Sequence, residues 1–176
     1  WSSFQCSAAF EKIRSTGRCG SPKYATARSG GSANSRHGDG VLATTPPVAD
    51  EHPDSYLYDP LDPVPTVGGK TLMPSIMTAG IEDQADVEDR EDVLCYTSPI
   101  LTTPVVVHGP VRVELWAASS AIDTDFTAKL VDVAHDEIAY NLADGIVRAR
   151  YRDSPRLRSE PLEPGAPTLF SIDLWD

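Results

Sequence analysis

Apolar and polar residues alternate along four short segments in the second half of the chain, "PVRVELWA", "DFTAKLVDV", "GIVRARYR" and "PTLFSIDLW". A period of two puts successive side chains on opposite faces of a strand, so each segment predicts a β-strand with one buried face. The expected buried residues are Val111, Val113 and Leu115, then Phe126, Ala128 and Leu130, then Val147, Ala149 and Tyr151, and finally Phe170, Ile172 and Leu174.

Other segments complete a predicted β protein. "DVLCYTS" and the β-branched "TPVVVHG" predict two more strands, and residues 29–47 predict a loop, a hairpin and an edge strand at Val41 and Leu42. The stretch "DSYLYDPLDPVPTVGGK" contains two Asp-Pro steps, which exclude helix and predict an ordered strap across a surface.

The fold class follows from these short strands, from their Gly, Pro and Asp turns, and from the lack of a helical period. Together they predict an all-β chain folded as a two-sheet β-sandwich. A length of 176 residues suits one domain. Residues 1–28 show no sustained period and are expected to be irregular or poorly ordered, so the domain is expected to span 29–176.

Charge and composition exclude several partners. The net charge of −11 argues against binding to nucleic acid or to an anionic membrane. No apolar run is long enough to cross a bilayer and no signal peptide is recognisable, so a soluble, cytoplasmic protein is expected. The three cysteines, Cys6, Cys19 and Cys95, have no C-x-x-C spacing, which indicates reduced thiols. A homo-oligomer is left open.

Motifs for catalysis are absent from the sequence. There is no G-x-S-x-G nucleophile elbow, glycine-rich phosphate loop, dinucleotide fingerprint or H-E-x-x-H helix. The histidines His37, His52, His108 and His135 are each isolated, and none is favoured as a catalytic base. The expected sets of catalytic, cofactor-binding and metal-binding residues are therefore empty, no cofactor is expected, and no ligand-binding residue is identified.

Some acidic residues remain open to two interpretations. Asp123 and Asp125 could act as an acid and base pair or ligate calcium, but capping of loop amides is favoured. Residues 80–92, rich in Asp and Glu, are interpreted as a solvated loop in preference to a cation site. Asp132 is expected to face outward or to pair with Arg148 or Arg150.

One aromatic residue stands out from the expected core. Trp116 lies on the outward side of its predicted strand. Because a large exposed aromatic side chain often contacts a partner, Trp116 is a candidate for a docking surface.

Three motifs of the chain, "YLYDPLDPVPTVGG", "DTDFTAKLVDV" and "DGIVRARYR", taken together, resemble the C-terminal domain of the CocE/NonD family of serine hydrolases, which includes cocaine esterases and X-Pro dipeptidyl-peptidases. The resemblance covers residues 29–176. It implies a jelly-roll sandwich of the galactose-binding-like kind, whose partners are an α/β-hydrolase domain that carries the catalytic triad and a helical cap domain. None of the triad positions falls within this chain.

The function that the resemblance implies is that of an accessory domain. It would pack on the hydrolase domain and shape the cleft in which the parent enzyme hydrolyses esters or Xaa-Pro peptide bonds, so enzymatic activity of this chain alone is uncertain. The alternative is a free-standing jelly-roll module that binds carbohydrate or protein. Family members continue beyond "IDLW", and residues 1–28 do not resemble a hydrolase, so an incomplete sandwich is expected from either a fragment or a shifted reading frame.

Overall fold

The computed structural model describes residues 53–71, 78–107, 109–153 and 159–174 together with four strands nearer the N-terminus. The described elements are β1 (Ser3–Ser7), β2 (Lys12–Ser15), β3 (Tyr24–Arg28), β4 (Gly40–Ala43), α1 (Ala85–Glu88), β5 (Cys95–Thr97), β6 (Val111–Ala117), β7 (Asp125–Val133), β8 (Ala139–Arg148), the 3₁₀ turn η1 (Ala149–Tyr151) and β9 (Thr168–Asp173). The regular elements in this part of the chain are therefore strands apart from α1 and η1, as predicted.

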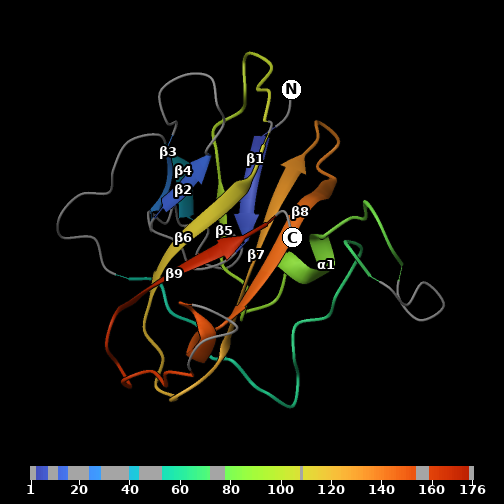
Figure 1. Cartoon of the computed structure of the whole chain (residues 1–176). Helices are drawn as coiled ribbons and strands as arrows, with labels where there is room; N and C mark the ends of the chain where they lie inside the picture. The colour runs from blue at the N-terminus through green and yellow to red at the C-terminus, as the bar shows by residue number, and fades with distance from the viewer. Residues whose placement is uncertain are drawn as a thin grey trace.

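The strands form a sandwich. Their order is β8-β7-β1-β5-β4-β3-β2-β6-β9, and every neighbouring pair is antiparallel except β4 with β5. Strand β3 pairs with β4 on one side and β2 on the other, which links the two layers. Figure 1 shows β6 and β9 crossing in front of the layer that contains β1, β7 and β8.

The core fills the space between the two layers. Phe126 on β7 meets Phe170 on β9 with ring centroids 4.6 Å apart, in a tilted arrangement. Val113 and Leu115 of β6 have no exposed surface, and neither has Phe170. Burial of such side chains stabilises each by about 1.5–3 kcal/mol relative to exposure, so these strands supply much of the driving force for folding.

Most strand predictions are confirmed. The alternation in β6 and β9 matches the burial of their side chains, and Phe126 and Ala128 of β7 are buried. Three predictions are wrong. Strand β4, predicted to be an edge strand, lies between β3 and β5 and pairs with both. Residues 104–107 form no strand and are exposed, and the alternation expected through Tyr151 ends at Ala149, because the chain turns into η1 there. Strand backbone also lies before Ser29, in β1, β2 and β3, and the domain boundary at Ser29 stays a prediction.

A bulge in β8 changes which residues share a face. Leu130 of β7 pairs with Ala143, but the next residue, Val131, pairs with Asn141, so Leu142 is the extra residue on β8. The insertion places Asn141 on the same face as Asp144. Because of it, polar residues from both halves of β8 lie on the side of the sheet that is turned away from the core.

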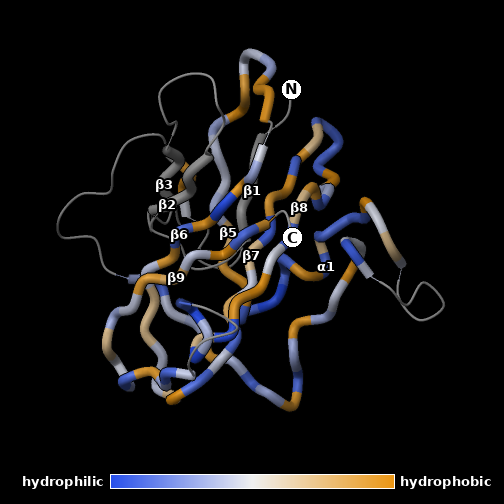
Figure 2. Tube along the Cα trace, in the orientation of Figure 1, coloured by the Kyte–Doolittle hydropathy of each residue, from blue (hydrophilic) through white to orange (hydrophobic). Residues whose placement is uncertain are grey.

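The predicted strap is present as residues 53–71. It has no regular secondary structure beyond one bridge at Gly69, and most of its side chains are exposed. Figure 2 shows hydrophobic stretches along this surface segment, which is teal in Figure 1. In the part of the chain that the structure describes, no helix has the length and apolar character needed to cross a membrane.

Candidate docking surface

The strap presents large apolar side chains to solvent. Leu57 is 89% exposed and Leu61 94% exposed, and the neighbouring Tyr56 and Tyr58 are 38% and 46% exposed. Single exposed leucines are common on protein surfaces, but four such residues within six positions form an apolar patch. This patch is a candidate docking surface.

The backbone under the patch is held in one conformation. The turn begins at Asp59, whose carbonyl accepts from the amide of Asp62 at 3.1 Å and whose Oδ1 accepts from the amide of Leu61 at 2.9 Å. Pro60 and Pro63 fix two further φ angles. The apolar side chains therefore extend from a preorganised turn, which lowers the entropy lost when a partner binds.

Arg90 joins this turn to the segment that follows α1. Its Nη2 donates to the carbonyl oxygen of Asp62 at 2.8 Å and lies 3.3 Å from the Asp62 carboxylate. The same guanidinium donates two hydrogen bonds to the Asp92 carboxylate, from Nε to Oδ1 at 2.7 Å and from Nη2 to Oδ2 at 2.9 Å. Hydrogen bonding from Arg90 lowers the pKa of Asp92, although burial acts in the opposite direction.

We expect the Arg90–Asp92 pair to stabilise the fold only above acidic pH. The pKa of Asp92 is lowered in the folded state, so its contribution is present above the unfolded pKa of about 3.9 and is lost as the pH falls through the folded value. The difference in melting temperature between the wild type and Asp92→Asn should be smaller at pH 3 than at pH 7. An equal difference at both pH values would contradict the assignment.

A buried polar network fixes the other end of the strap to β8. Gln84 has no exposed surface and Asn141 has 4%. The Gln84 amide donates to the carbonyls of Val67 and Glu82, each at 3.1 Å. Asn141 accepts from the Glu82 amide at 2.7 Å and donates to the Gly80 carbonyl at 3.2 Å. The strap is thus attached through side chains that satisfy buried backbone groups.

Lys129 belongs to the same network. Its ammonium donates to Gln84 Oε1 at 2.6 Å. Burial lowers the pKa of Lys129, while the charges of Asp144 and Glu88 act in the opposite direction. Lys129 therefore orients the Gln84 amide so that its NH₂ group faces the strap carbonyls.

Three glycines lie where the strap approaches the network. Gly69 and Gly80 exchange backbone hydrogen bonds of 2.7 and 3.0 Å. Gly68 has φ of +67°, and a Cβ at that position would lie 2.6 Å from the Gly80 carbonyl oxygen. Neither the conformation nor the space admits a side chain at Gly68 without movement.

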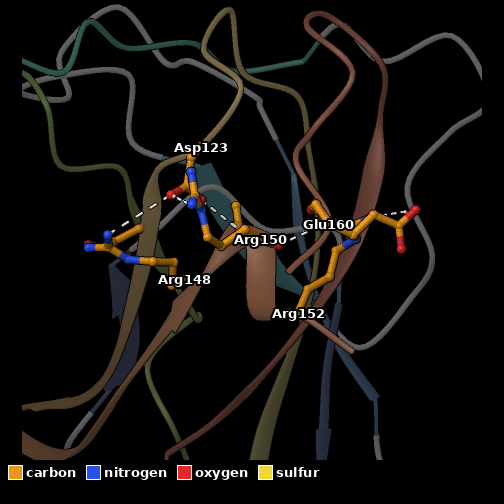
Figure 3. Close-up of polar contacts among 7 residues, drawn as sticks. Asp123, Arg148, Arg150, Arg152 and Glu160 are labelled. Atoms are coloured by element: carbon orange, nitrogen blue, oxygen red, sulfur yellow. Dashed lines mark hydrogen bonds and ion pairs between the residues drawn. The ribbon is translucent and has the colours of Figure 1, made fainter. Parts of the chain in front are cut away.

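Asp123 and Asp125 lie beside arginines at the other end of β8, and Figure 3 shows Asp123 with Arg148 and Arg150. Arg150 Nε is 2.6 Å from Asp123 Oδ2, and the Arg150 amide donates to Asp123 Oδ1 at 3.1 Å. Arg148 donates to Asp125 through Nε and Nη2 at 2.8 and 2.6 Å. Asp123 therefore does cap a backbone amide, but it is the amide of Arg150 in η1 and not one of its own loop, while Asp125 pairs with Arg148. The loop amide of Ala121 is capped by Ser119 Oγ instead.

The pairing predicted for Asp132 is wrong. In the β7–β8 register Asp132 lies opposite Tyr140, whereas Arg148 lies opposite Asp125. The Oδ1 atom of Asp132 is buried and has no hydrogen-bond partner among the described residues. Since β7 and β8 form a hairpin, residues near its turn cannot reach arginines at its open end.

The remaining candidates have separate positions. Trp116 is 49% exposed on the outer face of β6, as expected, beside Leu169 of β9, which is 45% exposed. His135 lies in the β7–β8 turn, and Cys95 is a buried thiol. The other three histidines and Cys19 lie outside the described residues, as does the side chain of Cys6.

Residues 80–92 are not simply a solvated loop. They contain α1, and Gln84 and Val87 within them are buried. Among the residues the structure describes, no three His, Cys, Asp or Glu side chains gather in a way that could hold a metal ion.

The network of Gln84, Asn141 and Gly68 was not singled out from the sequence. The adjacent Gly68 and Gly69 after a proline-rich segment were the one available signal, because paired glycines often mark a close approach of backbone. Gln84 lay within an acidic run and gave no signal of burial.

Comparison with known proteins adds the following. Residues 20–176 match the family described as the X-Pro dipeptidyl-peptidase C-terminal non-catalytic domain. The chain is similar to the cocaine esterase of Rhodococcus sp. (strain MB1 Bresler), with 52% identity over 124 residues. The match covers 70% of this chain and 21% of that relative, so the chain spans about a fifth of the length of the curated protein it matches.

Proposed function

Because the chain belongs to the family of X-Pro dipeptidyl-peptidase C-terminal non-catalytic domains, found in hydrolases of the CocE/NonD type, we propose that it packs on an α/β-hydrolase domain and shapes its substrate cleft. Bond cleavage would then take place in the α/β-hydrolase domain, which carries the catalytic triad and is assisted by the cap domain. The substrate class of the parent enzyme would be an acyl ester, an acylated amine or an Xaa-Pro peptide.

The observation that carries this proposal is the exposed apolar strap. Leu57 and Leu61 are almost fully exposed, although the turn between them is fixed by Asp59 and Arg90. Exposed apolar side chains on a rigid backbone are typical of surfaces that become buried against another domain. A strap fixed at both ends could also serve as an immobile wall of a cleft.

The proposal is tested with a chimera of a known hydrolase. In the Rhodococcus cocaine esterase, the part that matches this chain is replaced by this chain, and ester hydrolysis is measured after heating. We expect an active chimera whose Leu61→Asp variant loses thermal resistance, because a charge would enter the interdomain contact. In the isolated chain the same substitution should change the free energy of unfolding by no more than about 0.5 kcal/mol.

A matched control separates docking from general surface effects. Ile122 is 59% exposed and lies in the β6–β7 loop, which is not part of the strap. Ile122→Asp should leave the chimera as heat-resistant as the parent chimera. Equal losses from both substitutions, or no loss from Leu61→Asp in an active chimera, would contradict docking through the strap. Saturable glycan binding by the isolated chain would favour the carbohydrate-binding alternative.

A further inference from the structure

The apolar patch of the strap lies among acidic side chains. Residues 53–62, which carry the patch, and residues 83–92, which Arg90 joins to it, contain one cation, Arg90 itself. Arg90 is already bonded to Asp62 and Asp92. The same two segments contain nine carboxylates, namely Asp54, Asp59, Asp62, Asp83, Asp86, Glu88, Asp89, Glu91 and Asp92.

Three of these carboxylates are exposed and form no ion pair with a described residue. Asp59 lies inside the patch, and its carboxylate accepts the amide of Leu61 at 2.9 Å, a contact that leaves its charge unneutralised. Asp89 and Glu91 flank Arg90 in the chain, but the Arg90 guanidinium is directed to two other carboxylates. The negative charges of these three residues therefore have no cationic partner in the part of the chain that the structure describes.

The acidic segment and the patch are held side by side. Arg90 Nη2 donates to the carbonyl oxygen of Asp62 at 2.8 Å, and Asp62 directly follows the last leucine of the patch. Burial raises the pKa of Tyr56, and the charge of Asp92 raises it further, so this phenol also lies near the acidic segment. The patch thus has an acidic border on the side where Arg90 attaches the turn.

The charges narrow the choice of partner. Two copies of this chain that met through the patch would bring their acidic borders together, and like charges across an interface oppose association. A partner face with lysines or arginines around its apolar contact would instead neutralise carboxylates that this chain leaves unpaired. Such a face would also relieve the repulsion among the acidic side chains of the two segments.

We propose that the strap docks on a face of the hydrolase domain whose apolar contact is bordered by lysine or arginine side chains. This inference rests on the docking role proposed above and adds the chemistry of the partner. The exposed leucines and tyrosines supply the apolar contact, while the acidic border steers and orients the docking.

The test uses the chimera described above, with single substitutions of two exposed acids. Unfolding of the chimera on heating is followed by tryptophan fluorescence, which does not require enzymatic activity. At low salt we expect Asp89→Lys and Glu91→Lys each to shorten the half-life of the folded chimera about three- to tenfold, because a cation would face the basic border. At about 1 M salt the Debye length falls to about 3 Å, and the difference should shrink below about twofold.

Two controls separate docking from the stability of the domain itself. Glu163→Lys makes the same change of charge at an exposed residue of the loop before β9, and the half-life of the chimera should stay the same. In the isolated chain, Glu91→Lys should leave the free energy of unfolding unchanged or raise it, because one member of a mutually repelling group is removed. A lower stability of this isolated variant would contradict the proposal.

The remaining outcomes distinguish the chemistry of the partner from docking itself. Unchanged half-lives in Asp89→Lys and Glu91→Lys, an equal loss in Glu163→Lys, or a loss that persists at high salt would overturn the basic partner face. The Leu61→Asp chimera then identifies the step that fails. If it still loses thermal resistance, the strap docks on a face without a basic border; if it does not, docking through the strap has failed as well.

Discussion

Replacement of Gly145 by alanine is expected to destabilise the domain by at least about 3 kcal/mol, a large fraction of the stability of a typical domain. A Cβ on Gly145 would overlap the carbonyl oxygen of Asp173 and would lie 3.1 Å from Cγ2 of Ile172. The closest of these atoms belongs to the backbone of β9 and cannot rotate away. The β8 and β9 layers would have to separate, exposing the core around Phe170 and Ile172.

Urea denaturation followed by tryptophan fluorescence measures this loss. The control is Ala143→Gly, which changes a residue on the same strand that packs against the same core. That change removes a methyl group and should cost only about 1 kcal/mol. A Gly145→Ala variant that unfolds at the wild-type urea concentration would show that β8 and β9 do not approach each other as described.

Residue periodicity predicted those parts of the fold in which one face of a strand is buried. Strands β6 and β9 lie across the core from the opposite layer, so their apolar residues recur at every second position. The run at 104–107 looked equally suitable, because its residues are β-branched, but they are exposed and form no strand. β-propensity describes how a residue fits a half-buried strand and does not provide the neighbouring strand that it requires.

The polar contacts were harder to predict, because they depend on register and on residues distant in sequence. Asp132 was expected to face outward or to meet an arginine of "RARYR", but the β7–β8 turn sets a register that pairs Arg148 with Asp125. The network at Gln84 requires the bulge at Leu142, which brings Asn141 onto the strap side of the sheet. A single inserted residue of this kind leaves no clear mark in the pattern of apolar positions.

The glycine that admits the strap provides the second large expected effect. We expect Gly68→Ala to destabilise the domain by about 2–4 kcal/mol, because it combines an unfavourable left-handed backbone with a steric conflict. The new Cβ would lie 2.6 Å from the Gly80 carbonyl oxygen and 3.0 Å from Asn141 Oδ1. The side-chain amide of Asn141 carries that Oδ1 and donates a hydrogen bond to the Gly80 carbonyl oxygen, so the substitution would disturb the strap and the buried network together.

Gly165→Ala is the matched control, because Gly165 also has a left-handed φ, +79°, but nothing lies within 4 Å of the position of its Cβ. It should lose only about 1 kcal/mol, the cost of the conformation alone. The excess loss in Gly68→Ala then measures the steric conflict with the network.

Hydrogen exchange adds a positional test, since the amide of Glu82, which donates to Asn141, should lose protection in Gly68→Ala and keep it in Gly165→Ala. Equal losses of stability in the two variants would mean that the strap is not fixed by this network, and a wall for a neighbouring catalytic cleft would then need another source of rigidity.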